Sequence, residues 1–380
     1  MKVSARRSEK LTAPHLKGSL GRTDTSDVGL VAHRLRVSMS AHRFLTPAFP
    51  GYESVPARLL ADISVLPCDL HVWRGPRPAL YAMRGGDPGK VIARAERGLP
   101  FLIRETDADL LRGALAASLP GVLGNQRISP IERSKTAYLI AAKVLAPLFV
   151  HEDFLDHDGF ATTRKVMESI ALGLLEDEEM IWAMVATMLK HTATHTHAIN
   201  TAVYGIALAR SIPLGSQEAI RGVALGGLIH DIGMNRVPRA VLDKAGPLND
   251  LEWRLVRGHA KAGYDMVVRA MGYPPPYAHI IAEHHERCDG SGYPEGRTGS
   301  SIALDSQLVA IVDAFDALTT RRPFRRALSA FDALQLMRLG MEGQFSDELV
   351  CGFADLLGGW KALGHDRSAS NPPKLLRKAG

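Results

Sequence analysis

Apolar residues recur at helical spacing over most of the chain after residue 132. Ala137, Ile140, Ala141 and Val144 follow the i, i+3, i+4, i+7 pattern of an amphipathic helix, and residues 166–174 repeat it. After residue 190 no two neighbouring segments show the alternation of paired strands, and prolines separate the periodic segments. The pattern predicts a mainly α protein.

The segment from 52 to 115 has a different pattern. Short apolar pieces at 79–83 and 100–103 are separated by a run of turn-forming residues at 84–89. Residues 90–98 fit a short helix between two strands. We therefore expect a small α+β domain ahead of the helical region.

These patterns divide the chain into five predicted parts. They are a disordered basic tail at 1–43, a small α+β domain at 44–131 with an expected regulatory role, connecting helices at 132–189, the main helical domain at 190–360 and a flexible tail at 361–380. The composition, 46% hydrophobic and 23% charged, is that of a globular protein rather than a disordered one.

The net charge of +6 is located in the two tails. Residues 1–43 carry +6 and residues 361–380 carry +4, which leaves −4 on residues 44–360. Basic tails can contact anionic partners, but they serve solubility equally well. No basic groove is indicated, so a nucleic-acid polymer is not expected as a partner.

Targeting and cysteine patterns favour a cytoplasmic protein. No stretch reaches the ~18 apolar residues of a membrane span, and the basic N-terminus is not followed by an apolar run. Cys68, Cys288 and Cys351 lie far apart and form no CxxC pair, so we expect neither a disulfide framework nor a cysteine zinc site.

Histidines and aspartates gather in the helical half of the chain. The group comprises His191, His195, His197, His230, Asp231, His259, His279, His284, His285 and Asp313. Imidazole and carboxylate ligands together suit divalent Fe, Mn, Zn or Ni, and a carboxylate can bridge two ions. A single histidine in an apolar helix is more often a hydrogen-bonded core residue. The series within 117 residues, 197–313, favours a shared metal site.

The His230-Asp231 pair follows an apolar run and precedes Gly233. Adjacent helical residues point about 100° apart, so both can face one cluster only at an irregular helix end. Gly233 supplies such an end. Burying this ionisable pair is costly unless a metal or a partner compensates it.

The order of these motifs resembles the HD-GYP family of metal-dependent phosphohydrolases over residues 190–345. The motifs are His230-Asp231-Ile232-Gly233, Val237-Pro238, 244–248, His259 with Gly263, 284–294 and 313–325. The resemblance implies an all-helical HD-type catalytic domain, preceded here by the small α+β domain. It also implies hydrolysis of cyclic di-GMP, a bacterial second messenger.

The resemblance implies a binuclear metal site with two divalent ions, Fe or Mn. Its ligands would be His197, His230, Asp231, His259, His284, His285 and Asp313. Asp231 would bridge the ions, and His230 and Asp231 would be the catalytic pair. His191 and His195 would lie on a helix surface. A water activated between the metals would open the ring to linear pGpG, with GMP as the product of a second round.

Substrate contacts are expected from Arg322, Arg325 and Tyr293. A guanidinium fork matches phosphate geometry, although Arg322 and Arg325 also fit a solvated basic surface run. Asp289 is a candidate to orient a ligand histidine, and Cys288 is expected to be buried and structural. The Gly-Tyr-Pro segment could also bind signalling partners.

Two positions depart from the family. Met234 stands where the family has a lysine that reaches the substrate phosphate, which predicts weakened activity unless Arg236 compensates. Ala193 replaces a glutamate that supports a third metal in some members, which favours two metals.

Three functions remain open from the sequence. The first is a cyclic di-GMP phosphodiesterase, the second a low-turnover cyclic di-GMP receptor or interaction module, and the third an HD phosphohydrolase acting on another nucleotide. A homodimer is also compatible with the sequence. Residues 52–115 faintly resemble an uncharacterised domain that precedes some HD-GYP domains, for which we expect a regulatory role.

Overall fold

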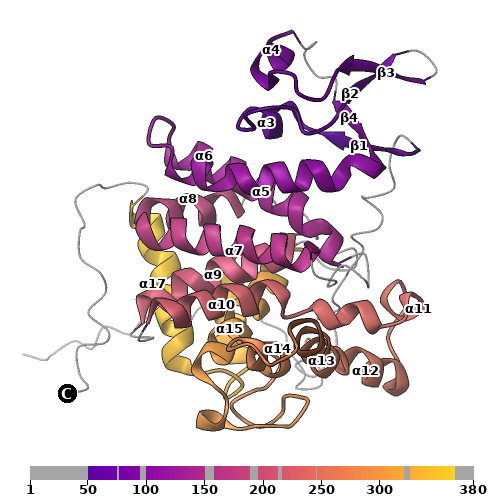
Figure 1. The fold of residues 1–380 in the computed structure, drawn as a ribbon. Coiled ribbons are helices and arrows are strands. Elements are labelled where there is room, and N and C mark those ends of the chain that lie inside the picture. Colours follow the sequence, from indigo (N-terminus) through magenta and orange to yellow (C-terminus); the bar gives the residue numbers. More distant parts are fainter. Residues whose placement is uncertain are drawn as a thin grey trace, which may run out of the picture. The chain divides into compact units, whose positions relative to one another are not determined.

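The computed structural model describes residues 50–74, 77–94, 100–149, 158–188, 196–212, 216–244, 246–320 and 326–363 (Figure 1). The predictions for residues 1–43 therefore lie outside the described residues, as does nearly all of 361–380. The boundaries proposed at 131 and 189 stay predictions.

A four-stranded antiparallel sheet opens the described chain. Its strands are β1 (Tyr52–Val55), β2 (Leu70–Arg74), β3 (Arg77–Ala82) and β4 (Phe101–Arg104), in the order β1-β4-β2-β3. The short helix α3 (Ala57–Leu60) follows β1, and α4 (Pro88–Ala93) lies between β3 and β4. Asp87 starts α4 by accepting hydrogen bonds from the backbone N–H groups of Gly89 and Lys90. The small α+β region and its helix between two strands are confirmed.

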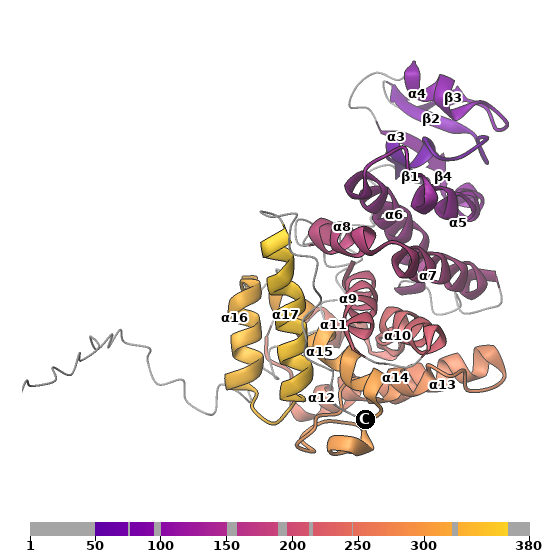
Figure 2. The same ribbon diagram turned by 90° about the vertical axis from the view of Figure 1, so that its left-hand side faces the viewer.

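Among the described residues, four α-helices follow the sheet and precede the main helical region. They are α5 (Ala108–Gly124), α6 (Pro130–Leu145), α7 (Asp158–Glu176) and α8 (Glu178–Met188). Ser129 caps α6 by accepting from the N–H of Glu132, and Pro130 occupies the first helical position. Helix α6 is tied to the sheet, because Lys143 Nζ lies 2.6 Å from the Glu53 carboxylate of β1. Figures 1 and 2 both show the sheet beside α5 and α6.

The described elements after residue 196 are helices and turns, apart from one isolated β-bridge between Asp289 and Thr298. The helices are α9 (His197–Ser211), α10 (Gln217–Ile229), α11 (Arg239–Leu242), α12 (Asp250–Arg257), α13 (His259–Met271), α14 (Ala278–Glu283), α15 (Leu304–Thr319), α16 (Ala330–Gln335) and α17 (Asp347–Leu363). The mainly α fold class is therefore confirmed.

Helix α9 forms the centre of this helical region. All of its residues from Ala198 to Ala209 are buried, and it packs against α10 and α15. A helix that is apolar all round is stable only when other elements surround it. The neighbouring α15 is also almost wholly buried, so the two helices together form the core of this region. The candidate ligands lie at the ends or on the inner faces of these helices.

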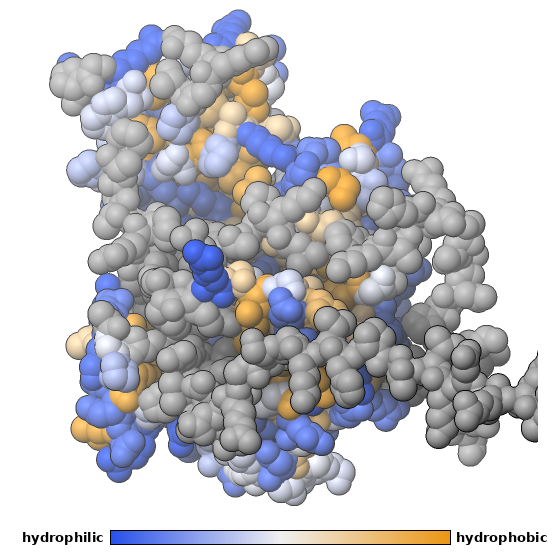
Figure 3. Space-filling view, turned by 180° about the vertical axis from the view of Figure 1, so that it is seen from behind, coloured by the Kyte–Doolittle hydropathy of each residue, from blue (hydrophilic) through white to orange (hydrophobic). Residues whose placement is uncertain are grey.

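Hydrophilic side chains are interspersed with smaller hydrophobic areas on the face drawn in Figure 3. Leu80, Met83 and Leu339 are examples of large apolar side chains that are exposed. No helix in the described part of the chain combines the length and apolarity that a membrane crossing needs.

Candidate metal centre

The His230-Asp231 pair lies where α10 ends. The helix stops at Ile229, and a short 3₁₀ segment, Ile232–Arg236, follows the pair. Both side chains are buried. The predicted irregular helix end is confirmed, and it lets two adjacent residues contribute to one cluster.

Gly233 brings a second helix against this turn. A Cβ atom at Gly233 would collide with the backbone carbonyl oxygen of His259, and it would lie 2.5 Å from the N atom of Gly263. The absence of a side chain at 233 therefore allows the start of α13 to approach the turn. As a result, His259 Nε2 lies 3.2 Å from Asp231 Oδ1.

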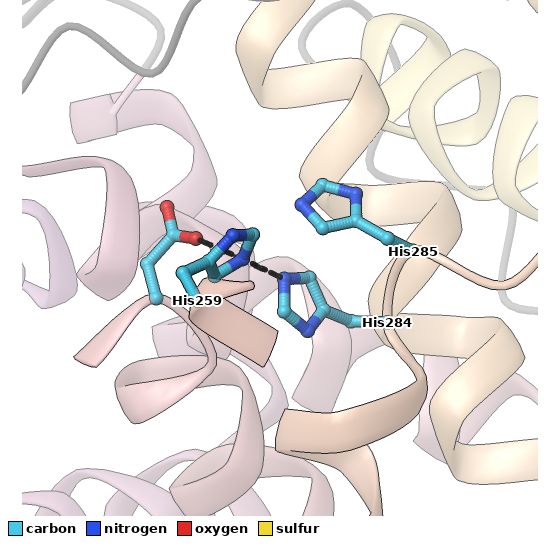
Figure 4. A group of neighbouring side chains, drawn as sticks. His259, His284 and His285 are labelled. Atoms are coloured by element: carbon cyan, nitrogen blue, oxygen red, sulfur yellow. Dashed lines mark hydrogen bonds and ion pairs between the residues drawn. The ribbon is translucent and has the colours of Figure 1, made fainter. Parts of the chain in front are cut away.

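One group of candidate ligands forms around Asp231. Its members are Asp231, His259, His284 and His285, whose ligand atoms lie within 4.8 Å of one another. His259 Nε2 is 3.2 Å from His284 Nε2, and His284 Nε2 is 3.8 Å from Asp231 Oδ1. In Figure 4 the rings of His284 and His285 point from the chain after α14 toward the His259 ring.

The second group consists of His197, His230 and Asp313, again with ligand atoms within 4.8 Å. His197 Nε2 lies 3.0 Å from Asp313 Oδ1, and His230 Nε2 lies 3.8 Å from the same oxygen. The two groups meet at Asp231, because its Oδ2 lies 3.4 Å from His230 Nε2. The structure thus brings together all seven residues predicted as ligands.

Hydrogen bonds fix the tautomers of the histidines. His230, His259 and His284 each donate from Nδ1 to the backbone carbonyl three residues earlier, at Gly227, Val256 and Ile281. His197 donates from Nδ1 to Asp316 Oδ2, at 2.7 Å. A carbonyl or carboxylate oxygen only accepts, so each Nδ1 carries a proton and Nε2 is the ring nitrogen left for a metal ion. On His197, whose pKa Asp313 and Asp316 raise, this nitrogen must first lose its proton.

This donor set fits divalent cations. His230 Nε2 and Asp231 Oδ1 are buried without a hydrogen-bond partner among the described residues. The facing Nε2 atoms of His259 and His284 would place two lone pairs 3.2 Å apart. Such atoms are costly to bury unless a cation or a proton lies between them. Metal coordination resolves both features, and neutral imidazole with carboxylate is a ligand mixture that transition metals accept.

The pKa values of the candidate ligands are shifted in different directions. Burial lowers the pKa of His284 to about 4 and holds that of His285 well below its usual range. Burial opposes ionisation of Asp231, but His230, His259 and His284 outweigh it and lower the carboxyl pKa. Neutral His284 and His285 beside an ionised Asp231 are the protonation states that metal ligation requires. Burial also opposes the charge on His197, yet Asp313 and Asp316 raise its pKa to about 10.

Asp316 was not predicted as a site residue, yet it holds His197 in place. It is buried and accepts hydrogen bonds from His197 Nδ1 and from Asn200 Nδ2, at 2.7 and 2.8 Å. A signal was present in the sequence: Asp316 lies three residues after Asp313, and residues at this spacing share a helix face.

Tyr293 lies at the edge of the centre. Its ring stacks on His285, with 4.6 Å between centroids and 29° between planes. Arg257, which the sequence did not single out, places its guanidinium carbon 5.7 Å from the Tyr293 centroid. This pair supplies an exposed cation and an aromatic face beside the metal-binding atoms.

Glu286 orders the segment that carries Tyr293. Its two carboxylate oxygens accept from the backbone N–H groups of Glu295 and Arg297, at 2.7 and 2.9 Å. Gly292 is required for the close return of the chain, since a Cβ there would lie 2.5 Å from Glu286 Cα. The Gly-Tyr-Pro segment is therefore held firmly against the histidine pair.

Some expectations need correction. Asp289 does not orient a ligand histidine, because its Oδ1 accepts from the N–H and hydroxyl of Ser291 and stabilises the local turn. Cys288 is only partly buried, with its Sγ 3.8 Å from Gln307 Oε1. The side chain of Met234 is fully buried in an apolar cluster with Val237 and Leu248, and the weakened activity expected from this position stays a prediction.

Several predicted positions lie outside the described residues. They are Arg322, Arg325, Ala193, His191 and His195. His279 is described, and it forms a hydrogen bond with Asp305 Oδ1 at 2.8 Å, away from the two ligand groups.

Comparison with known proteins identifies the helical region. Residues 179–348 match the family described as HD domain. A cyclic di-GMP phosphodiesterase of Pseudomonas aeruginosa is 31% identical over 193 residues, 51% of this chain and 46% of the relative. A 3'3'-cGAMP-specific phosphodiesterase of Vibrio cholerae is 36% identical over 148 residues, 39% of this chain and 32% of the relative.

A third relative is the cyclic di-GMP phosphodiesterase response regulator RpfG of Xanthomonas campestris, 37% identical over 120 residues, 31% of this chain and 32% of the relative. The chain thus spans from about a third to just under half of the length of these curated relatives. An HDGYP protein from Bdellovibrio bacteriovorus shares the fold with a TM-score of 0.59 at 17% identity, over 81% of this chain and 100% of that one. Residues 179–348 therefore form an HD domain, and this region is similar in sequence to the cyclic-dinucleotide phosphodiesterases named above.

Proposed function

We propose that the chain is a metal-dependent phosphodiesterase that hydrolyses a cyclic dinucleotide, with cyclic di-GMP as its substrate. The observation that carries the proposal is the pair of buried ligand groups that meet at Asp231. One oxygen of this carboxylate faces His230 and the other faces His259, which is the arrangement a bridging carboxylate needs.

The proposed cofactors are two divalent ions, Fe or Mn. His197, His230 and Asp313 would hold one, and His259, His284 and His285 would hold the other, with Asp231 shared between them. Bound there, such ions supply charge neutralisation for a phosphodiester and activation of a water nucleophile. The protein's own part is to direct the Nε2 atoms of His230, His259 and His284 toward the centre and to keep Asp231 ionised.

The substrate contacts proposed here are Tyr293, Arg257, Arg322 and Arg325. Tyr293 offers an aromatic face beside His285 that suits a nucleobase or ribose. Arg257 lies next to that face and can form charge-assisted hydrogen bonds with a phosphate. The first product would be linear pGpG, with GMP from a second cleavage.

A second substrate is favoured by a specific observation. The Vibrio cholerae relative at 36% identity is described as specific for 3'3'-cGAMP, while those from Pseudomonas and Xanthomonas are described as cyclic di-GMP phosphodiesterases. Both substrates present the same bridging phosphates to the metal centre. They differ in one base, so the residues that contact this base at the edge of the site would determine which substrate is preferred.

The test compares both substrates directly. Protein loaded with Mn²⁺ is incubated with cyclic di-GMP or with 3'3'-cGAMP, and the products are resolved by chromatography. Linear pGpG formed faster than cleaved cGAMP supports the proposal, and the reverse order assigns the second substrate. Tight binding of unchanged cyclic di-GMP would instead indicate a receptor.

Met234 bears on the rate of this reaction. We propose that turnover is slower than in a relative with lysine at this position, because a thioether cannot hold a phosphate. The side chain lies in the apolar cluster with Val237, Leu248 and Val256. Any phosphate contact must therefore come from other residues of the chain.

A further inference from the structure

A series of buried hydrogen bonds leads from α6 to the candidate ligand His197. Tyr138 of α6 donates from its hydroxyl to Asn200 Oδ1, at 2.9 Å. Asn200 donates from Nδ2 to Asp316 Oδ1 at 2.8 Å, and the other oxygen of Asp316 accepts from His197 Nδ1 at 2.7 Å. Tyr138, Asn200 and Asp316 are each at most 4% exposed.

The donors and acceptors in this series have one consistent direction. An ionised Asp316 can only accept, so Asn200 must turn its NH₂ group toward it. The carbonyl oxygen of Asn200 then faces Tyr138 and requires a donor, which the tyrosine hydroxyl supplies. Removing that hydroxyl would leave a buried amide oxygen without this donor and would allow the amide to turn.

Helix spacing explains why the series can form. Asn200 lies three residues after His197 on α9, and Asp316 lies three residues after Asp313 on α15. The two helices pack against each other, so each contributes one ligand and one supporting residue to the same face. Tyr138 closes the series from a third helix.

Tyr138 lies outside the region that matches the HD domain, which begins at residue 179. Its helix is anchored to α3 and β1, because Arg58 Nε of α3 donates to Thr136 Oγ1 at 3.1 Å and Lys143 forms an ion pair with Glu53 of β1 at 2.6 Å. Helix α6 therefore contacts the N-terminal region through Thr136 and Lys143. It contacts α9, which carries the ligand His197, through Tyr138.

We propose that Tyr138 is a positioning residue that fixes His197 for metal binding through Asn200 and Asp316. The inference rests on the proposed metal centre. It means that the ligand group of His197, His230 and Asp313 is completed by a residue from the upstream helices, while the group around His259 is not.

The test measures Mn²⁺ binding by calorimetry to metal-free, full-length protein. His285→Ala is used to weaken the group around His259, and His197→Ala is used to weaken the other group. Tyr138→Phe is added to each. In the His285→Ala background, Tyr138→Phe should weaken Mn²⁺ binding about 3- to 10-fold, because one buried hydrogen bond is lost. In the His197→Ala background it should change the affinity less than twofold.

Two further variants separate positioning from general packing. Asn200→Leu interrupts the same series at its second member and should reproduce the effect in the His285→Ala background. Tyr204→Phe is the matched control, because Tyr204 is a buried tyrosine that packs on Phe315 of α15 without a hydrogen bond to Asn200 or Asp316 among the described residues. It should leave the Mn²⁺ affinity unchanged.

The outcomes are distinguishable. Equal weakening by Tyr138→Phe in both backgrounds, or no weakening in either, overturns the positioning role. If Tyr138→Phe does not fold, Asn200→Leu decides by the same comparison. Wild-type protein that binds no Mn²⁺, Fe²⁺ or Zn²⁺ would instead overturn the metal centre itself and the proposed function with it.

Discussion

The backbone carbonyl oxygen of His259 occupies the space that a side chain at Gly233 would need. This contact joins the turn after α10 to the first residue of α13 and sets the distance between Asp231 and His259. The glycine of the His-Asp-x-Gly motif therefore serves the packing of two ligand-bearing elements.

Gly233→Ala is expected to push α13 away from the turn. We expect the free energy of unfolding to fall by about 1–3 kcal/mol, as for other overpacked sites, and the bound metal to fall with it. Gly222→Ala is the control, since a Cβ at that position in α10 meets nothing within 4 Å. Denaturant unfolding and elemental analysis check both variants, and full metal content in Gly233→Ala would contradict this reading.

Asp231 is expected to be essential for metal retention. Protein purified anaerobically should contain two ions per chain, and Asp231→Ala should lose most of them because each carboxylate oxygen faces a different ligand group. Asp265→Ala on α13 removes a carboxylate that pairs with exposed Lys261, and it should change nothing. A wild-type content near one or three ions, or retained metal and activity in Asp231→Ala, would show that the bridge is wrongly assigned.

Arg257 is expected to contact substrate phosphate. Replacing it by Ala should raise KM for cyclic di-GMP about 10- to 100-fold while leaving metal content unchanged, because a charge-assisted hydrogen bond contributes about 1.5–3 kcal/mol. Arg254→Ala, an exposed arginine on the same helix, is the matched control. Steady-state kinetics of both variants provide the test. Equal KM values would show that Arg257 does not contact the substrate.

Replacing Met234 by Lys is expected to have opposite effects on stability and catalysis. The side chain is fully buried among apolar residues, so an ammonium there should cost about 3 kcal/mol or more of folding free energy. Met234→Leu should preserve the cluster. The proposed missing phosphate contact predicts a higher kcat for folded Met234→Lys than for Met234→Leu. Equal kcat values, measured where both variants are folded, would show that position 234 does not limit turnover.

The pair of His279 and Asp305 predicts a pH-dependent contribution to stability. The hydrogen bond to Asp305 raises the pKa of His279, burial opposes this, and the charges of Asp305 and Glu283 add to the increase. Since the folded pKa is raised, the stabilisation is fully present below the unfolded value of about 6.5 and is lost as the pH rises through the folded pKa. Urea unfolding of wild type and His279→Gln should therefore differ most at acidic pH. A difference that grows with pH would reverse the sign.

The sequence allowed much of this structure to be predicted. Helical periodicity indicated the mainly α fold, and Gly233 after an apolar run indicated the helix end that lets His230 and Asp231 share a cluster. The separation of the seven ligands into two groups could not be predicted, because it depends on how α9, α13 and α15 pack. Asp289 shows an error of prediction from sequence proximity. It lies near ligand histidines and was expected to orient one of them, but its Oδ1 accepts a hydrogen bond from the backbone N–H of Ser291 in its own turn.

Tyr138 shows where local patterns carry no information. It lies 62 residues from its partner Asn200, and nothing in the apolar spacing of its helix distinguishes it from a core tyrosine. Asp316 could have been found from its spacing to Asp313, whereas Tyr138 required the packing of α6 against α9.

The three hydrogen bonds from His230, His259 and His284 to carbonyls three residues earlier have a thermodynamic consequence. Each ring is hydrogen-bonded to its own turn of backbone, so a ring that leaves the centre must break that bond, and a turn that frays displaces its ring. Ligand loss and local unfolding at the ends of α10, α12 and α14 are therefore one cooperative event, and the free energy of ion binding is distributed over three separate segments of the chain.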